Sequence, residues 1–229
     1  MAGGETKVTL IGRIKQKLIA AKEKTARERR LQSAPMDAPV PGYNTRNRLP
    51  PGQRLVEKWP VLDLGVTPRL ERADWRLTVD GLVEAPAAWS WDEVMALPQS
   101  DVRADIHCVT TWSLYDSLWR GIRTRDLIAL VRPRPEARFV ILRAYDGYTT
   151  NLPLARFAED DALLAHSRNG AEIPLEHGAP LRVVVPSLYF WKSAKWVRRI
   201  TFAAEDAPGY WEVRGYHNDA DPWKEERYA

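Results

Sequence analysis

Cysteine is nearly absent from this sequence: Cys108 is the only one among 229 residues. A single cysteine excludes an internal disulfide, a four-cysteine zinc site and an iron–sulfur cluster held by four thiolates of one chain. Histidine is also scarce, and no two histidines have the His-x-x-x-His spacing of a helical zinc site; they are His107, His166, His177 and His217. Ligand spacing alone therefore predicts no zinc centre.

Long apolar runs and glycine-rich loops are missing as well. No segment reaches the roughly 18 consecutive apolar residues of a membrane-spanning helix. The N-terminal region has no apolar signal core, and the pair Arg29-Arg30 precedes polar residues rather than an apolar run. We therefore expect a cytoplasmic protein. Neither a phosphate-binding glycine loop nor a Gly-x-Ser-x-Gly nucleophile turn is present, so the sequence favours neither a nucleotide-binding fold nor a serine hydrolase.

Positive charge is concentrated in one region. Residues 1–48 contain eleven Lys or Arg and four Asp or Glu, a surplus of seven, so residues 49–229 carry about −3 of the net +4. A nucleic-acid-binding domain has a basic folded face, so we expect no nucleic-acid partner. Residues 1–32 also carry apolar side chains at three- and four-residue spacings, which predicts a basic amphipathic helix. Such a helix docks on a partner protein or a membrane surface, or packs on its own domain.

The rest of the chain alternates between turn signals and short periodic segments. Residues 33–61 are rich in Pro, Gly and Asn and predict an extended connector, which leaves 62–229 as the main domain with an aromatic tail from Gly209. The predicted strands are 75–83, 102–106, 138–144, 149–154, 163–167, 172–175, 181–186 and 197–203, with 181–186 central. Short helices are predicted after Ser90, from its capping-box spacing to Glu93, and after Thr124. The pattern favours an α+β fold with a mixed sheet.

Cys108 follows a strand-like segment and precedes small polar residues, Thr110 and Thr111. A thiolate at the end of a strand is placed to act as a soft metal ligand or as a nucleophile. A nucleophile needs a histidine base. His107 points to the opposite face of a strand from its neighbour, which leaves His177 or His217 for that role. A lone cysteine is also commonly a small buried apolar residue, so these readings stay open at this point.

Four cations gather around Trp191: Lys192, Lys195, Arg198 and Arg199. They form either a solvated face or an anion site completed by Ser193 and backbone N–H groups. Arg182 enters an apolar strand from the turn at His177. Burial of its guanidinium is costly without an anionic partner.

Three ordered motifs resemble the molybdopterin-binding domain of the sulfite oxidase superfamily. They are His107-Cys108-Val109-Thr110-Thr111-Trp112-Ser113, His177-Gly178-Ala179-Pro180-Leu181-Arg182-Val183-Val184-Val185-Pro186 and Tyr189-Phe190-Trp191-Lys192-Ser193-Ala194-Lys195. The nearest branch is the catalytic subunit of the molybdenum methionine-sulfoxide reductase. The likeness runs from about Trp59 to Ala203, and the tail resembles that of stand-alone sulfite oxidase-like oxidoreductases.

The resemblance implies a molybdopterin cofactor with molybdenum and a set of residues that hold it. Cys108 would be the protein thiolate on the metal, which agrees with the preference of such metals for soft sulfur. The implied cofactor contacts are His177 and Arg182 on the pterin or its phosphate, Ser193, Ala194 and Lys195 around the phosphate, and Leu62 and Asp63 near the start of the domain.

The sequence departs from its relatives at several positions. His177 stands where the reductase has asparagine, and Ala144 where it has a cofactor-contacting threonine. The Cys-x-Gly-Asn-Arg-Arg run of true sulfite oxidases is absent, which disfavours sulfite, a dianion best held by clustered arginines. Arg120 and Arg123 remain candidates to approach the metal.

We therefore expect oxygen-atom transfer on a small S- or N-oxide substrate. Trp112, Tyr148 or Tyr189 would form the substrate wall. Electrons would come from a separate partner protein, since the chain has no ligand set for haem or an iron–sulfur cluster. Two other classes stay open: a cysteine-dependent hydrolase or transferase without metal, and a non-catalytic basic binding protein.

Overall fold

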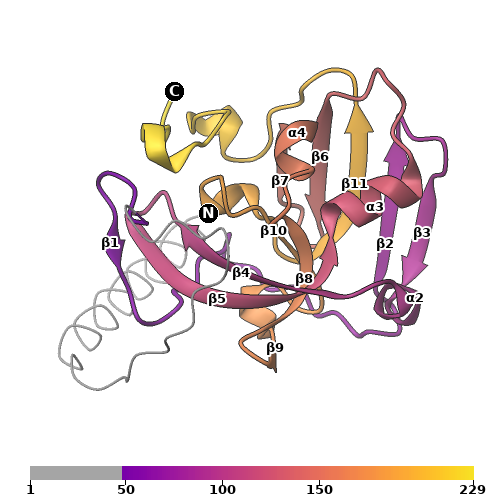
Figure 1. Cartoon of the computed structure of the whole chain (residues 1–229), viewed down its shortest axis with the longest axis horizontal. Helices are drawn as coiled ribbons and strands as arrows, with labels where there is room; N and C mark the ends of the chain where they lie inside the picture. Colours follow the sequence, from indigo (N-terminus) through magenta and orange to yellow (C-terminus); the bar gives the residue numbers. More distant parts are fainter. Residues whose placement is uncertain (1–47) are drawn as a thin grey trace, which may run out of the picture. The chain divides into compact units, whose positions relative to one another are not determined.

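The computed structural model describes residues 48–229; the predicted helix at 1–32 and the first part of the predicted connector lie outside them. One of its two sheets has five strands in the order β3-β2-β11-β6-β7 (Figure 1). These strands are β3 (Ala87–Ser90), β2 (Arg76–Gly81), β11 (Val197–Ala203), β6 (Phe139–Ala144) and β7 (Thr149–Pro153). Strand β11 runs parallel to β2, and the other neighbours are antiparallel.

The second sheet has six strands built around the twelve-residue strand β5. Its members are β1 (Arg54–Leu55), β5 (Trp112–Arg123), β8 (Leu163–Arg168), β10 (Arg182–Val184), β4 (Ser100–His107) and β9 (Ala171–Glu172). Strand β5 pairs in parallel with β1 and antiparallel with β4 and β8. Both sheets are mixed, which confirms the predicted α+β class, although we expected one sheet.

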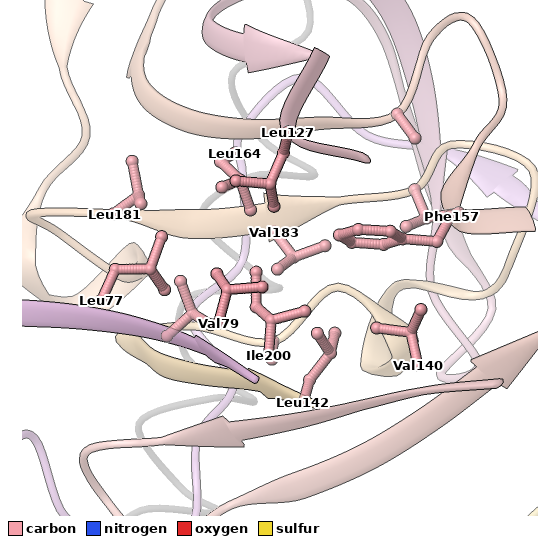
Figure 2. Close-up of a cluster of buried hydrophobic side chains, with 14 of the residues drawn as sticks. Leu77, Val79, Leu127, Val140, Leu142, Phe157, Leu164, Leu181, Val183 and Ile200 are labelled. Carbon is pink, nitrogen blue, oxygen red and sulfur yellow. The ribbon is translucent and has the colours of Figure 1, made fainter. Parts of the chain in front are cut away.

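The main core lies between the two sheets. Figure 2 shows Leu142 and Ile200 of the five-stranded sheet facing Leu164 and Val183 of the six-stranded one. Side chains alternate along a strand, so the neighbouring residue Val184 belongs instead to a second apolar cluster, together with Cys108 and several aromatic rings. The six-stranded sheet is thus covered on both faces, and its second face carries the candidate site.

Within residues 48–229, three short helices and two 3-10 turns connect the strands, and two further 3-10 turns lie in the tail. The helices are α2 (Trp91–Ala96), α3 (Thr124–Val131) and α4 (Leu154–Phe157), and the turns are η1 (Leu175–His177), η2 (Phe190–Lys192), η3 (Glu212–Arg214) and η4 (Pro222–Lys224). The predicted capping box is confirmed, because Ser90 and Glu93 exchange both hydrogen bonds at the start of α2. None of the helices in residues 48–229 is long and apolar enough to cross a membrane.

Three local predictions were wrong. The N-cap of α3 is Arg123, and the hydroxyl of Thr124 donates to Ala162 O at 3.1 Å. The predicted strand at 172–175 is only β9, because Leu175 begins η1. Among the described strands, β10 lies at the edge of its sheet and pairs only with β8.

The other edge of β10 is covered by irregular chain. Val183 donates its N–H to Ala194 O at 2.9 Å, and Val185 donates to the hydroxyl of Ser193 at 2.9 Å. This pairing explains why β10 is as buried as a central strand. It also places the segment around Ser193 directly beside Arg182, the first residue of β10.

Candidate cofactor site

A cavity of about 330 Å³ lies on the covered second face of the six-stranded sheet. Segments far apart in the sequence form its wall: residues 59–64, 108–112, 146–148, 177–182, 190–195 and 211–216 each contribute. All eight residues implied by the resemblance lie on this wall, namely Leu62, Asp63, Cys108, His177, Arg182, Ser193, Ala194 and Lys195.

Cys108 is the first residue of a tight turn between β4 and β5. Its N–H donates to Trp112 O at 2.8 Å, and its carbonyl accepts from the N–H of Thr111 at 3.0 Å. Thr111 has a φ of 70°, which closes the turn. The sulfur lies 3.2 Å from the hydroxyl oxygen of Thr110. His107 points elsewhere, with Nδ1 2.8 Å from the hydroxyl of Ser113, as the strand geometry predicted.

The thiol lacks the environment of a cysteine nucleophile. Burial raises the pKa of Cys108, and hydrogen bonds from Thr110 and the charge of Arg227 only oppose that effect. His177 is stacked on Trp59, and Nδ1 of His217 accepts the N–H of Asp219 at 3.2 Å. No histidine in residues 48–229 is hydrogen-bonded to the thiol. A buried thiol on a cavity wall, without a base, suits a metal ligand better than a nucleophile.

Arg182 is a buried cation that is surrounded by backbone carbonyls. Its side chain donates to Ser193 O at 2.8 Å, to His177 O at 2.7 Å and to Val183 O at 3.3 Å. No carboxylate within the described range pairs with it, and burial lowers its pKa to about 9. A guanidinium has five N–H donors, so donors remain for a ligand. An anion in the cavity would offset the cost of burying this charge.

Lys195 and its neighbour Ala194 provide further donors beside Arg182. The Lys195 ammonium donates to Glu176 O at 2.8 Å, and burial together with the nearby Arg182 lowers its pKa to about 8. The backbone N–H groups of Ala194 and Lys195 have no hydrogen-bond acceptor in the described part of the chain. Two free N–H groups and an ammonium next to a buried guanidinium fit a phosphate.

Gly178 holds the turn of the His-Gly-Ala-Pro motif against these groups. It has a φ of +114°, and a Cβ built on it would lie 3.0 Å from Cβ of Lys195 and 3.1 Å from Cβ of Arg182. Only glycine combines that backbone conformation with so close an approach. The donor set and the sulfur on one wall therefore fit a phosphate-bearing cofactor with a thiolate-bound metal.

The predicted cationic cluster is not one site. Lys192 is fully buried, with Nζ 2.7 Å from Oε1 of Glu212. Arg199 pairs with Asp80 at 2.8 Å, and Arg198 lies over the ring of Tyr145. Of the four predicted cations only Lys195 lines the cavity. The prediction was wrong because neighbours in sequence point in different directions along η2 and β11.

Arg120 and Arg123 do not reach the cavity. Arg120 pairs with Asp101 at 2.8 Å, and Arg123 donates to the carbonyl of Asp160 at 3.1 Å. Neither is on the wall. Both lie near the end of β5 that is remote in sequence from Cys108, so the predicted approach of these arginines to the metal was wrong.

The aromatic wall is only partly as predicted. Trp112 and Tyr148 line the cavity, whereas Tyr189 lies behind it, stacked on Trp191 with ring centroids 5.4 Å apart. Sequence reasoning missed Trp211 and Tyr216, which are stacked at 4.9 Å and both line the cavity. The unusual aromatic content of the tail was the available signal.

Comparison with known proteins agrees with this site. Residues 64–211 match the family described as the oxidoreductase molybdopterin binding domain. The chain is 47% identical over 183 residues to the uncharacterized oxidoreductase YuiH of Bacillus subtilis (strain 168), covering 80% of this chain and 92% of that protein. It is 30% identical over 148 residues to a putative protein-methionine-sulfoxide reductase subunit, YedZ1, of Azospira oryzae, and the match covers 65% of this chain and 56% of that protein.

A solved structure shares the fold. The sulfane dehydrogenase SoxCD from Paracoccus pantotrophus superimposes with a TM-score of 0.56 at 23% identity, covering 61% of this chain and 40% of that one. The motifs around Cys108, Arg182 and Lys195 all fall inside the matched family segment. The chain therefore belongs to the oxidoreductase molybdopterin-binding domain family and is a sulfite oxidase-like molybdenum oxidoreductase whose cofactor is molybdopterin with molybdenum.

Proposed function

We propose that the enzyme removes an oxygen atom from a small, neutral S-oxide or N-oxide, using electrons delivered by a separate partner protein. The observation that carries this proposal is the uneven lining of the cavity. Cys108 lies in an apolar cluster with Trp112 and Trp191, and Trp211 and Tyr216 pack against that cluster. Apolar walls with few polar groups are typical of sites for neutral ligands.

The cations of the cavity are grouped elsewhere. Arg182 and Lys195 both pack against Gly178, where the resemblance places the cofactor phosphate. An oxyanion such as sulfite or nitrate needs paired or clustered donors. The two arginines that were candidates for this role, Arg120 and Arg123, are engaged away from the cavity. A neutral oxide therefore fits the thiol side of the cavity better than an oxyanion.

The bound cofactor supplies a metal that changes oxidation state by two electrons. Removal of the oxygen balances as R₂SO + 2 H⁺ + 2 e⁻ → R₂S + H₂O. We assign to Tyr216 the proton for this step: the residue lines the cavity, its ring packs against Trp211 and Trp191, and burial raises its pKa, so the hydroxyl stays protonated. A protonated phenol can donate a hydrogen bond to the substrate oxygen.

A separate electron donor is supported by the cysteine content of the chain. With one cysteine, already placed on the cavity wall, no iron–sulfur cluster can be ligated by thiolates of this sequence. The name of the YedZ1 relative describes it as a subunit of a putative methionine-sulfoxide reductase. Both points support a sulfoxide-reducing subunit supplied with electrons from outside; its cellular compartment stays a prediction.

The test is anaerobic oxidation of a reduced viologen dye by enzyme isolated from a molybdenum-replete host. Dimethyl sulfoxide, methionine sulfoxide and trimethylamine N-oxide should each support turnover, and nitrate should not. Sulfite oxidation, followed with ferricyanide, should be slow by comparison. Rapid turnover of nitrate or sulfite, with none of the neutral oxides, would overturn the proposal. Molybdenum and pterin content, measured on the same sample, separates a wrong substrate class from missing cofactor.

A further inference from the structure

The aromatic tail reaches back to the cysteine turn through one side chain. We propose that Arg227 is a positioning residue, which holds the turn at Cys108 so that the thiol points into the cavity. The inference rests on Cys108 as the metal ligand and is independent of which substrate the enzyme reduces.

The guanidinium of Arg227 joins three segments. Nη1 donates to the carbonyl of Val109 at 2.7 Å, and Nη2 donates to the carbonyl of Pro51 at 3.3 Å. The same group lies over the ring of Tyr189 at 5.0 Å, and the side chain is 13% exposed. The planar guanidinium is largely buried and is held by two carbonyl acceptors and the face of the Tyr189 ring, so its position is fixed. The flexible ammonium of a lysine would not reproduce these contacts.

The contact acts on the residue next to the thiol. Val109 is buried, and Arg227 is the only donor to its carbonyl among the described residues. Two other carbonyls of the turn have their own donors: Cys108 O accepts from Gln53 Nε2 at 3.1 Å, and Thr111 O accepts from the N–H of Arg54 at 2.9 Å. Loss of Arg227 would leave the buried carbonyl of Val109 unpaired and free the Val109–Thr110 peptide, one residue beyond Cys108, to rotate.

The approach of Arg227 is built into the backbone around it. Gly52 has a φ of +66°, a conformation that favours glycine, and a Cβ built on it would lie 2.7 Å from Oε1 of Glu225 and 3.2 Å from Nη2 of Arg227. The carbonyl of Arg227 accepts from the N–H of His217 at 3.2 Å, and Tyr216 forms a β-bridge with Tyr228. The segment that carries Arg227 is therefore fixed to the segment that carries Tyr216. The C-terminal segment that carries Arg227 therefore contacts both the cysteine turn and the segment of Tyr216.

The test uses the fact that Cys108 is the only cysteine, so alkylation with iodoacetamide reports on this position alone. In full-length cofactor-free protein, Arg227→Gln should raise severalfold the pH-independent alkylation rate, taken from rates at several pH values. This comparison removes the effect of the lost Arg227 charge, which by itself raises the thiol pKa and slows alkylation at any one pH. In the molybdenum-loaded enzyme the same change should alter the Mo(V) EPR spectrum and lower kcat with little change in KM. Arg227→Lys, which keeps one donor, should lie between wild type and Arg227→Gln in all three readouts.

Arg214→Gln is the matched control. Arg214 is also in the tail, donates to a backbone carbonyl (Tyr210 O, 2.7 Å) and lies over a tyrosine ring, yet it does not touch the cysteine turn. It should leave alkylation and EPR unchanged. Wild-type alkylation and EPR in Arg227→Gln would overturn the inference, as would the same changes in Arg214→Gln. Where Arg227→Gln fails to fold, Arg227→Lys carries the same test. Alkylation involves no substrate, so failure of the oxide assay leaves this result intact.

Discussion

The imidazole of His177 lies flat against the indole of Trp59, with ring centroids 3.9 Å apart and planes 14° apart. The same indole lies beneath the guanidinium of Arg182 at 5.2 Å. Trp59 thus packs against both groups at the cavity wall. Burial, followed by the charges of Arg182, Lys195 and Arg168, lowers the pKa of His177 to about 4. At neutral pH His177 is therefore an uncharged hydrogen-bonding group.

This lowered pKa predicts acid sensitivity of the cofactor-free protein. The unfolded chain protonates His177 below the ordinary pKa of 6.5, whereas the fold resists protonation until about 4. The free energy of unfolding should therefore fall as pH falls between these two values. The limit is about 1.4 kcal/mol per pH unit, and we expect roughly 1 or less because the ring is partly solvated. His177→Asn should show a flatter profile in urea titrations over this range.

The difference between the two slopes of unfolding free energy against pH reports on His177 alone, because His107 and His166 titrate alike in wild type and in His177→Asn. Parallel stability profiles for wild type and His177→Asn would contradict the predicted pKa. A steeper profile in the variant would also count against it, since asparagine does not titrate.

Gly178→Ala should both destabilise the protein and loosen the cofactor. Alanine at a φ of +114° is strained, and its Cβ would press against the Cβ atoms of Lys195 and Arg182. Strain costs about 1 kcal/mol and crowding a further 1–3 kcal/mol. Urea unfolding of cofactor-free protein and molybdenum content per chain measure the two effects.

Gly147→Ala is the control for strain without crowding. Gly147 has a φ of +85° but no atom within 4 Å of a built Cβ. Its variant should lose about 1 kcal/mol and keep its molybdenum. Equal losses of stability and molybdenum in the two variants would show that crowding of Lys195 and Arg182 does not contribute to the effect of Gly178→Ala.

The features that the sequence predicts correctly depend on interactions between residues close together in the chain. The hairpin turn at Asn169-Gly170 has both residues at positive φ, and Ser90 caps α2, because each depends on neighbours within a few residues. Cys108 and Arg182, which come from two separate motifs, line one cavity, and their contacts with the cofactor stay a prediction. Turn chemistry and motif order were sufficient for these features.

Long-range packing explains what was missed. Nothing near Lys192 in sequence indicates that Glu212 will neutralise it in the interior. The same applies to Arg227, whose acceptor on Val109 is 118 positions away. Strand β10 looked central because both of its faces are buried, yet Ser193 supplies by a side chain the hydrogen bond that a neighbouring strand would give. Such pairings depend on the tertiary fold rather than on any local pattern.

Removal of Lys192 alone should be severely destabilising. Its ammonium is fully buried against Glu212, and it also donates to Asn151 O at 2.8 Å. Lys192→Met would leave the Glu212 carboxylate buried without a countercharge, at a cost of about 3–5 kcal/mol. The double variant Lys192→Met with Glu212→Gln should recover a large part, because the amide oxygen still accepts from Trp191 Nε1 and Thr150 Oγ1. Urea denaturation of both variants measures the difference.

Lys224→Met is the control for an exposed lysine. Nζ of Lys224, an exposed side chain, lies 3.8 Å from Oδ2 of Asp221. This substitution should cost less than about 1 kcal/mol. If the two changes in the Lys192 and Glu212 double variant are merely additive, the buried pair does not act as a unit and the prediction is wrong.

Arg182→Met separates cofactor binding from folding. A buried guanidinium without a carboxylate partner costs desolvation energy, so its removal offsets the loss of three hydrogen bonds to carbonyls. We expect the free energy of unfolding of cofactor-free protein to change by no more than about 1–2 kcal/mol. Bound molybdenum and pterin should instead fall to near zero. Arg182→Lys should keep part of the bound molybdenum and pterin, because an ammonium retains the charge of the guanidinium but not its planar set of donors.

Arg168→Met tests whether the loss is specific to the cavity. Arg168 also lies over Trp59, at 5.1 Å, but its Nε donates to Ser117 and it is not on the cavity wall. Its variant should retain molybdenum and pterin. Full molybdenum in Arg182→Met would remove Arg182 from the phosphate site. Equal loss in the Arg168 variant would assign the effect to the positioning of Trp59, because that ring is the contact which the two arginines share.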